Sequence, residues 1–361
     1  MFITMTSLEK LLARMHSRHF ATLASSGTIG LIAAIRALSL NGKRIGVPNN
    51  VCLSVPQAII YAGSTPVYLD VEVDSLGLSP DLVSVRDDIA AVVAVHSYGR
   101  MCKIEQLESI CKRKGMYLIE DFSVAQGASG INGAAGSYGD ISVTSFGAGK
   151  IIDIGHGGAV FTDNKVLNQK VQEFFLNLAD PTIAKREQTD KVMGLQKEIY
   201  NKEFLVNQKV NPEPISKIMK QNRESYFVRW DDRYIEKLEI ALNDLRGNIL
   251  RRRLKASYLI SRLSGISGID IINHDHGDVY WRFNILVTNG RNKMFLKLLD
   301  MHLLVSSWYP SVNNFVPLDY KETVSTPNSN LISNQIINLW VNDEADEYYL
   351  ETVCNEIINI K

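Results

Sequence analysis

Residues 116–163 read MYLIEDFSVAQGASGINGAAGSYGDISVTSFGAGKIIDIGHGGAVFTD and hold the features that decide the fold. One apolar run ends on a carboxylate, Asp121, and a second run, residues 140–146, leads into a glycine-flanked lysine, Lys150. Short apolar runs bounded by turn residues are typical of buried strands. The stretch therefore predicts two strands, each followed by a loop that carries a charged side chain.

The same rhythm extends towards the N-terminus. Short apolar runs such as RIGVP, PVYLDV and IAAVVAV alternate with helical patterns from Leu23 to Val160. This alternation predicts an α/β fold with a mostly parallel sheet. Ligands of such sheets bind beyond the carboxyl ends of the strands, where Pro48, His96 and Asp121 would fall. We expect their three loops to share one rim.

The second half of the chain has a different pattern. Residues 181–214 are charged and poor in strands, which predicts a surface excursion. A long helix is predicted from about Asp231, because apolar residues repeat there every three or four positions. Strand and helix patterns return beyond Gly268. We therefore predict a large domain over residues 1–235, followed by a connecting helix and a small α+β domain over residues 236–361.

The composition excludes several classes of protein. With 361 residues and 45% hydrophobic content the chain can bury a large core, and its 39 basic and 39 acidic side chains give a net charge of +0. That balance argues against nucleic-acid and anionic-membrane partners. The four cysteines lack the C-x2-C spacing of a zinc site, so no metal is expected. No long apolar segment is present, and we expect a cytoplasmic protein.

Lys150 stands between glycines and apolar runs. Glycines permit close approach of the backbone, and partial desolvation favours the neutral amine, which is the nucleophilic form of a lysine. The segment GAGKI also invites comparison with a phosphate-binding P-loop. That comparison fails because Thr144 replaces the first glycine and Ile151 replaces the magnesium-binding hydroxyl residue.

Small residues precede a strongly apolar helical segment in SSGTIGLIAAIRAL, residues 25–38. A helix N-terminus of this kind is either an anion cradle or a plain helix cap, and Asp121 by itself could equally be a polar cap at the end of a strand. Together, an anion cradle, a strand-end carboxylate and a desolvated lysine match the requirements of pyridoxal phosphate. The conjunction is more specific than any of its members.

The sequence resembles the DegT/StrS family of sugar aminotransferases that depend on pyridoxal phosphate. The segments SSGTIGLIAAIRAL, VPNNVCLSVPQAIIYAGSTPVYLDVEVDSLGLSP, VVAVHSYGRMCKIEQLESICKRKGMYLIED and GSYGDISVTSFGAGKIIDIGHGGAVFTD follow one another in the family's order and spacing. The resemblance is strong over residues 23–163 and weaker beyond. It implies the type I fold of pyridoxal-phosphate transferases.

Roles for individual residues follow from the resemblance. It implies that Lys150 is the catalytic lysine and forms the Schiff base, that Asp121 pairs with the pyridine nitrogen, and that Ser145 binds the cofactor phosphate. The cradle of the phosphate is implied to include Gly27 and the backbone N–H groups of Thr28 and Ile29. A lysine at position 150 also argues against the family's dehydratase branch, where histidine takes its place.

The sequence departs from the family pattern at three positions of the cofactor shell. Val124 stands where glutamine or histidine is usual, and Gln126, two residues further on, is the candidate substitute. Cys52 occupies the place of the aromatic residue that stacks on the cofactor ring. Phe227 aligns with an asparagine that the second subunit normally donates.

The resemblance implies a homodimeric aminotransferase that passes an amino group, with glutamate as the expected donor, to a nucleotide-linked keto sugar for polysaccharide or sugar-metabolite biosynthesis. Two alternatives stay open, because the cofactor shell is altered. One is a different reaction with the same cofactor, such as epimerisation or elimination. The other is a non-catalytic binding or regulatory role.

Some polar residues have plainer interpretations. His96 and Tyr98 match a family motif near the site, yet a strand-end histidine satisfied by hydrogen bonds is the commoner case. Arg229 fits either a substrate contact or a surface ion pair. The run Arg251–Arg253 is expected to form a solvated helix face.

Overall fold

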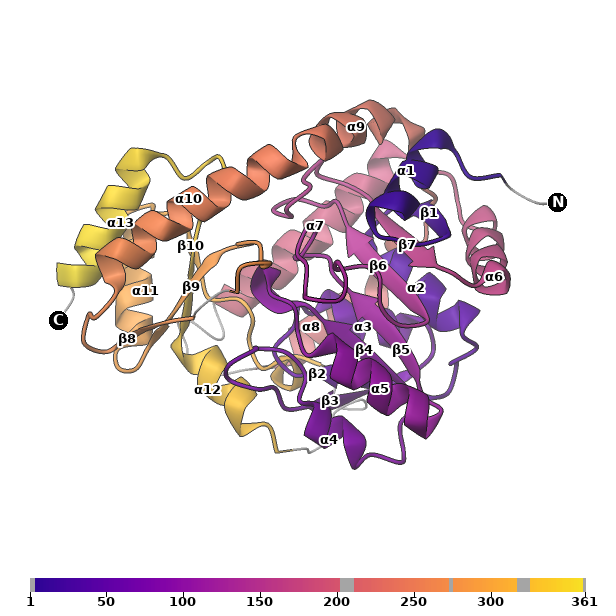
Figure 1. Cartoon of the computed structure of the whole chain (residues 1–361), viewed down its shortest axis with the longest axis horizontal. Helices are drawn as coiled ribbons and strands as arrows, with labels where there is room; N and C mark the ends of the chain where they lie inside the picture. The colour runs from indigo at the N-terminus through magenta and orange to yellow at the C-terminus, as the bar shows by residue number, and fades with distance from the viewer. Residues whose placement is uncertain (1–3, 202–210, 273–274, 317–324, 360–361) are drawn as a thin grey trace.

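The computed structural model describes residues 4–201, 211–272, 275–316 and 325–359. The larger of its two sheets has seven strands in the order β1-β7-β6-β5-β4-β2-β3 (Figure 1). Its strands are β1 (Phe20–Ala24), β2 (Arg44–Pro48), β3 (Thr65–Leu69), β4 (Ala91–Val95), β5 (Tyr117–Asp121), β6 (Ile141–Ser145) and β7 (Gly158–Thr162). Nearly every strand residue is buried, which explains why the sequence shows continuous apolar runs rather than alternation.

The pairing within this sheet confirms the predicted α/β fold with a mostly parallel sheet. Strands β3, β2, β4, β5 and β6 are parallel neighbours, whereas β7 runs antiparallel to both β6 and β1. The antiparallel β7 follows from a short connection, because residues 146–157 return directly beside β6 instead of crossing over through a helix.

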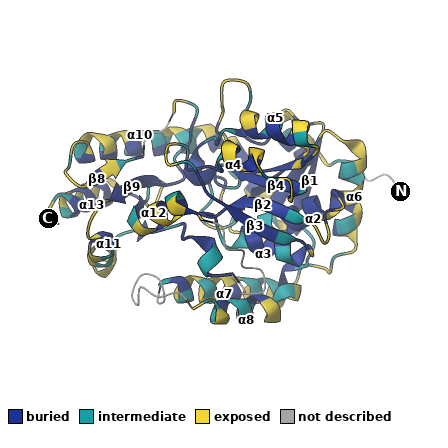
Figure 2. Ribbon diagram, turned by 90° about the horizontal axis from the view of Figure 1, so that it is seen from below, coloured by how far each residue is buried: buried dark blue, intermediate teal, exposed yellow. Residues whose placement is uncertain are grey.

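Helices cover both faces of the sheet, whose strands are mostly buried between them (Figure 2). Apolar side chains of α2, α3 and α6 pack on one face, and those of α4 and α5 pack on the other. These helices, together with the N-terminal α1, are α1 (Ser7–Met15), α2 (Gly27–Ala37), α3 (Ser54–Tyr61), α4 (Pro80–Ser84), α5 (Ile104–Lys114) and α6 (Lys165–Leu176).

The connecting helix begins close to its predicted start but consists of two helices. A short 3-10 turn, Asp232–Tyr234, precedes α9 (Ile235–Asn243), and α10 (Leu245–Leu263) continues in nearly the same direction (Figure 1). The apolar repeat that predicted this helix faces inward, since Leu238, Leu242 and Leu245 are buried.

Beyond α10 the chain forms an antiparallel four-stranded sheet in the order β10-β11-β9-β8, as the strand and helix patterns predicted. Helices α10, α11 and α13 pack against it around a second core. The elements of this region are β8 (Ile269–Ile271), β9 (Phe283–Val287), α11 (Arg291–Asp300), β10 (Val305–Ser306), α12 (Pro327–Gln335), β11 (Ile336–Leu339) and α13 (Glu347–Asn359).

The segment predicted as a surface excursion contains two helices, α7 (Ile183–Tyr200) and α8 (Glu213–Gln221). It is free of strands over its described residues, as expected, and most of α7 is exposed. However, Val192 and Tyr200 are buried, so α7 is fixed to the body of the protein at both its middle and its end.

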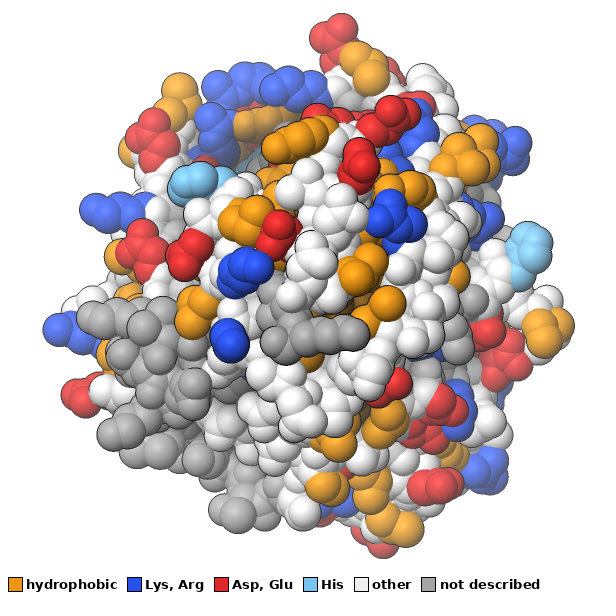
Figure 3. Space-filling model, turned by 90° about the vertical axis from the view of Figure 1, so that its left-hand side faces the viewer, with side chains coloured by type: hydrophobic (Ala, Val, Ile, Leu, Met, Phe, Trp, Pro, Cys, Tyr) orange, Lys and Arg blue, Asp and Glu red, His pale blue; other side chains and the backbone are white. Residues whose placement is uncertain are grey.

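Acidic, basic and hydrophobic side chains are interspersed on the face of the molecule shown in Figure 3. This mixture agrees with the balanced net charge of the sequence. In the described part of the chain, no helix combines the length and the apolar character that a membrane span requires.

Candidate active site

The topology of the large sheet brings four chain segments to one rim. Strands β1, β5 and β6 all end there, and the short return from β6 to β7 places the loop of Lys150 at the same edge. An isolated bridge between Ser26 and Gly157 joins the start of α2 to the end of that loop. The resulting cleft has an empty volume of about 1400 Å³, open solvent at its mouth included.

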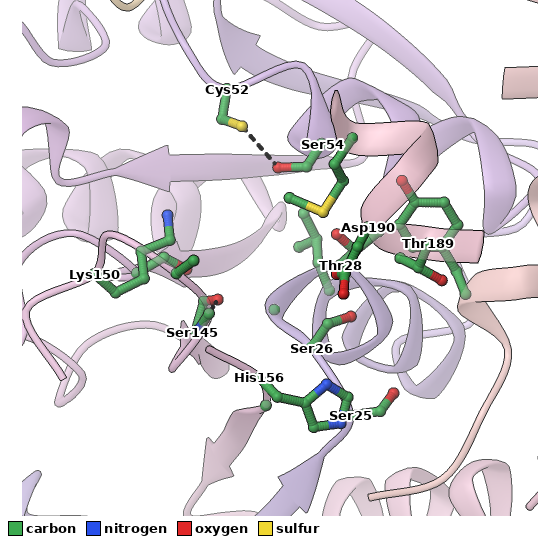
Figure 4. Close-up of a pocket in the computed structure, with 18 of the residues that line it drawn as sticks. Ser25, Ser26, Thr28, Cys52, Ser54, Ser145, Lys150, His156, Thr189 and Asp190 are labelled. Atoms are coloured by element: carbon green, nitrogen blue, oxygen red, sulfur yellow. Dashed lines mark hydrogen bonds between the residues drawn. The ribbon is translucent and has the colours of Figure 1, made fainter. Parts of the chain in front are cut away.

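Six of the residues predicted for the site line this cleft: Gly27, Thr28, Cys52, Asp121, Ser145 and Lys150. Figure 4 shows Lys150 and Ser145 on one side of it and Ser26 and Thr28 beside them. Sequence reasoning thus predicted residues that the fold brings together from four separate segments. Ile29 and Gln126, the other two predicted residues, do not line the cleft.

The N-terminus of α2 points its first-turn N–H groups at the cleft. Ser26 is the N-cap, and its hydroxyl oxygen accepts a hydrogen bond from the N–H of Ile29 at 3.2 Å. Ile29 is fully buried, and its N–H group is already engaged. The N–H groups of Gly27 and Thr28 have no acceptor within the helix, because the first turn of any helix leaves its donors without an intrahelical partner. Both residues line the cleft.

The loop of Lys150 is held by hydrogen bonds on both sides of the lysine. Asp153 accepts from the N–H groups of Gly149 at 2.6 Å and Gly155 at 2.8 Å. From the region of the second sheet, the indole Nε1 of Trp281 donates to the carbonyl oxygen of Gly149 at 2.6 Å. The side chain of Lys150 is half-buried.

The side chain of Gln126 forms hydrogen bonds to residues on both sides of this loop. Its amide nitrogen donates to the carbonyl oxygen of Ser145 at 2.7 Å and to the hydroxyl of Thr144 at 3.0 Å. Its amide oxygen accepts from the N–H of Ile152 at 3.0 Å. With all these bonds made and no exposed surface, Gln126 fixes the end of β6 relative to the lysine loop instead of facing the cleft.

Asp121 is 7% exposed at the end of β5. One carboxylate oxygen accepts from the N–H of Ser123 at 2.9 Å. This bond orients the carboxylate and leaves its other oxygen available to a group in the cleft. Asp121 thus makes the hydrogen bond of a strand-end cap and also lines the cleft.

The three positions at which this chain departs from the family pattern lie in different parts of the structure. Val124 and Cys52 line the cleft, and the thiol of Cys52 accepts a hydrogen bond from Ser54 at 3.1 Å (Figure 4). Phe227 lies outside this lining, where its ring stacks with the guanidinium groups of Arg36 and Arg223. Two of the three departures therefore change the cleft itself.

Three of the plainer interpretations can be checked. His96 is fully buried; its ring contacts Glu120 at 2.8 Å and accepts from the N–H of Cys102 at 3.1 Å, so it braces the sheet as expected. Arg229 forms an ion pair with Asp180. The solvated face predicted for Arg251–Arg253 is wrong for Arg252, which is buried and donates to the carbonyl oxygens of Tyr280 and Trp281.

The sequence did not predict that α7 and the residues just before it, from Pro181 to Met193, line the cleft. Tyr309, whose sequence context fits either the substrate mouth or packing in the small domain, enters the cleft from the second-sheet region. The N–H of Tyr309 donates to the hydroxyl oxygen of Tyr98 at 3.0 Å, and its ring stacks on Trp281. A threonine cap at Thr182 is the one sequence signal for α7, and it shows where the helix starts but not what it packs against.

His156 lines the cleft and carries a polar ring atom without a partner. Within the described residues, His156 Nε2 is buried and makes no hydrogen bond, and neither does Nε1 of Trp230, whose ring lies 6.2 Å from that of His156 outside the lining. Burial lowers the pKa of His156 below its ordinary value, and the neighbouring Arg186 lowers it further. The neutral imidazole therefore predominates at pH 7.

The sequence profile described as the DegT/DnrJ/EryC1/StrS aminotransferase family matches residues 3–203 of the chain. Two curated relatives match parts of the chain. A GDP-perosamine synthase of Vibrio cholerae is 36% identical over 154 residues, which are 42% of this chain and 42% of the relative. A UDP-N-acetyl-3-dehydro-alpha-D-glucosamine 3-aminotransferase of Acidithiobacillus ferrooxidans is 32% identical over 153 residues, or 41% of each chain. The match thus spans less than half the length of these relatives.

A solved structure of DesI in the presence of its TDP-sugar product superposes with a TM-score of 0.78 at 20% identity. The superposition covers 97% of this chain and 82% of that one. This likeness confirms the predicted type I fold over nearly the whole chain.

Proposed function

Because the chain belongs to the DegT/DnrJ/EryC1/StrS aminotransferase family, we propose that it is a pyridoxal-phosphate-dependent aminotransferase that converts a nucleotide-linked keto sugar to an amino sugar. The single observation that carries the proposal is the convergence of Asp121, Ser145 and Lys150 at the free N-terminus of α2 in one cleft. The substrate class is supported by the relative from Acidithiobacillus ferrooxidans, which is named as an aminotransferase of a nucleotide-linked dehydro sugar.

The residues present fit the cofactor. Gly27 keeps a narrow space open, since a Cβ there would lie 2.9 Å from Cβ of Ser145 and 3.5 Å from the Ser123 hydroxyl. The start of α2, at Gly27 and Thr28, and the hydroxyl residue Ser145 line the cleft beside that space. Helix N-terminal N–H groups and hydroxyls are the donors that a phosphate group requires. Asp121 supplies a buried carboxylate for a ring N–H, and Lys150 a primary amine for an aldehyde.

When bound, pyridoxal phosphate supplies a conjugated ring that accepts the electrons of a bond broken at the substrate carbon. Asp121 would hold the ring nitrogen through its carboxylate. Lys150 would hold the aldehyde carbon through Nζ, with loss of water, and the same amine, once the substrate's amino group had displaced it, would move a proton between the substrate carbon and the cofactor carbon. Val124 and Cys52 line the cleft, and Gln126 holds the two flanks of the lysine loop.

The finer parts of the proposal extend the family resemblance. We propose glutamate as the amino donor, biosynthesis of a polysaccharide or a sugar-decorated metabolite as the setting, a homodimer as the working form and the cytoplasm as its location. We also propose that residues 1–235 form the cofactor-binding domain, with the connecting helix and small domain over residues 236–361.

The experiment replaces Lys150 with alanine and uses Lys43→Ala, an exposed lysine, as the matched control. With pyridoxal phosphate and borohydride, the wild type and the control should acquire a reduced adduct that peptide mapping places on Lys150, and the variant should not. Turnover with glutamate and keto-sugar nucleotides should fall about 100-fold or more in the variant. Full activity of Lys150→Ala would refute the proposal.

A second reaction on the same cofactor is favoured by one observation, the placement of Cys52 and Val124 in the cleft wall. An epimerase or an eliminating enzyme needs no amino donor. Glutamate alone should convert the cofactor stoichiometrically to its aminated form in a transaminase, and absorbance spectra would reveal whether it does. Absence of cofactor binding by the wild type would instead favour a non-catalytic role.

A further inference from the structure

One wall of the cleft is formed by α7, which belongs to the segment that the sequence pattern had placed on the surface. Thr189 and Asp190 of this helix face the cleft opposite Lys150 (Figure 4). The helix is anchored at several points. Val192 is buried in the core, and the Thr189 hydroxyl donates to the carbonyl oxygen of Ser225 at 3.1 Å. The Tyr200 hydroxyl donates to the carbonyl oxygen of Ser307 at 2.8 Å. Side chains of α7 therefore hold fixed positions at the cleft.

Arg186 is the cation that α7 brings to this wall. Its half-buried side chain lines the cleft, its guanidinium donates to the Tyr234 hydroxyl, and the group lies over the Tyr234 ring, 5.5 Å from the centroid. Among the described residues, no carboxylate lies within 4.0 Å of it. Arg186 is thus positioned by an aromatic residue, and its charge is not neutralised.

This positive charge lies on the side of the cleft where α2 begins. The ring centroid of Tyr234 is 4.9 Å from that of His156, whose neighbour Gly157 pairs with Ser26, the N-cap of α2. Ser25, Ser26 and Arg186 all line the cleft. A guanidinium and the start of a helix therefore lie at the same part of the cleft.

The charges at this end favour an anion. A helix N-terminus contributes only about half an elementary charge, and His156 is neutral at pH 7. Three carboxylates of the described part of the chain line the cleft: Asp231 is paired with Arg233 at 2.6 Å, Asp121 lies at the end of β5, and Asp190 is exposed on α7. Two cations, Lys150 and Arg186, line it too. Arg186 is the cation that α7 supplies, and it is placed to balance part of the charge of a phosphate.

We propose that Arg186 binds a phosphate group held at the N-terminus of α2, so that a helix of the same chain completes the phosphate site. This inference rests on the proposed function for the identity of the ligands. Two ligands of that reaction carry the same chemistry: the cofactor has a phosphate monoester, and the nucleotide sugar has a diphosphate. The experiment has one arm for each.

The first arm measures the Kd of pyridoxal phosphate by absorbance titration, and the Kd of pyridoxal, which lacks the phosphate, as its reference. The second arm measures binding of UDP and GDP to the cofactor-loaded protein by calorimetry. The variants are Arg186→Gln, which keeps most of the side-chain volume, and Arg186→Lys, which keeps the charge. Lys185→Ala is the matched control, because Lys185 is adjacent in α7 but does not line this cleft.

If Arg186 binds the cofactor phosphate, Arg186→Gln should raise the Kd of pyridoxal phosphate at least about tenfold and leave the Kd of pyridoxal unchanged. The Lys185→Ala control should bind pyridoxal phosphate as the wild type does, and Arg186→Lys should recover part of the lost affinity. A comparable loss confined to UDP or GDP would assign the residue to the nucleotide's phosphates. Unchanged affinity in both arms, or equal weakening of pyridoxal, would overturn the inference.

The outcomes also separate this inference from the proposed function. Wild-type protein that binds pyridoxal phosphate on Lys150, together with an Arg186→Gln variant that binds it equally well, would refute only the role of Arg186. Wild-type protein that fails to bind the cofactor would refute the proposed function itself. Circular dichroism of each variant would show whether α7 and the rest of the fold are retained.

Discussion

Gly27 and Ser145 are in such close contact that a Cβ on the glycine would lie 2.9 Å from the serine Cβ. The two residues come from the start of α2 and the end of β6 and are separated by more than one hundred positions in the sequence. Their contact sets the width of the space in which the α2 donors and the Ser145 hydroxyl meet.

Gly27→Ala should therefore weaken pyridoxal phosphate binding at least about tenfold, because the added methyl group separates α2 from β6 and fills part of the phosphate space. The overpacking should also lower the free energy of unfolding by about 1–3 kcal/mol. Titration and urea unfolding measure the two effects. Gly194→Ala in α7 is the control: its Cβ would meet nothing within 4 Å, so affinity should be unchanged and the helix slightly stabilised. Equal affinity of Gly27→Ala and the wild type would contradict the prediction.

Gln126→Leu should destabilise the loop of Lys150. The substitution removes the acceptor of the buried Ile152 N–H and the donor to the Ser145 carbonyl, and each unsatisfied buried group costs about 1–3 kcal/mol. Urea unfolding should show a loss of about 2–4 kcal/mol, and hydrogen exchange at Ile152 should accelerate. Gln188→Leu, on the exposed face of α7, should change stability by less than about 0.5 kcal/mol. Unaltered exchange at Ile152 would show that Gln126 does not hold the loop.

Stability should decrease on acidification because of His16. Its side chain is buried against Phe122 and Phe161, and burial lowers its pKa below the ordinary value of 6.5. The unfolded chain then binds a proton more readily than the folded one, so this contribution is fully present above pH 6.5 and is lost as the pH falls through the folded pKa. Urea unfolding between pH 7.5 and 5 should show the loss.

In His16→Gln the loss of stability over this pH range should be smaller than in the wild type, whereas His276→Gln, at an exposed position, should retain the wild-type slope. The glutamine keeps an N–H donor for the Ala135 carbonyl, which contacts His16 Nδ1 at 2.8 Å, so the fold should be preserved. A His16→Gln variant with the full wild-type pH dependence would exclude this histidine as the cause.

The arrangement of the large sheet and of its polar strand ends was predictable because both depend on local patterns. Buried strands appear as apolar runs, and parallel strands must end at one edge, which is why the loops after Pro48, His96 and Asp121 could be placed at one rim. The spacing of Ser145 and Lys150 came from the family resemblance. By contrast, the N–H of Ile29 was predicted to bind the phosphate, but it donates to the hydroxyl oxygen of Ser26 instead. The sequence alone does not show which residue caps the helix.

Other features could not be predicted, since they depend on contacts between distant segments. Arg252 was predicted to be solvated, but its guanidinium donates to backbone carbonyl oxygens and not to acidic side chains. Every residue has a carbonyl group, so the sequence does not show which carbonyls bind an arginine. Helix α7 packs against the rest of the protein through two buried residues, Val192 and Tyr200. Two residues among charged ones are too few to produce a recognisable apolar stripe in the sequence.

The hydrogen bonds around Lys150 have a consequence for work with fragments. The segment that matches the family, residues 3–203, contains the lysine and Gln126, but Asn248 and Trp281, which bond to the carbonyl oxygens of Ile151 and Gly149, lie outside it. A truncated protein that ends near residue 203 would keep the sequence signature of the family while losing these two hydrogen bonds to the loop of its lysine. Split or permuted forms of the chain should therefore be cut elsewhere, so that Asn248 and Trp281 remain together with the loop that they hold.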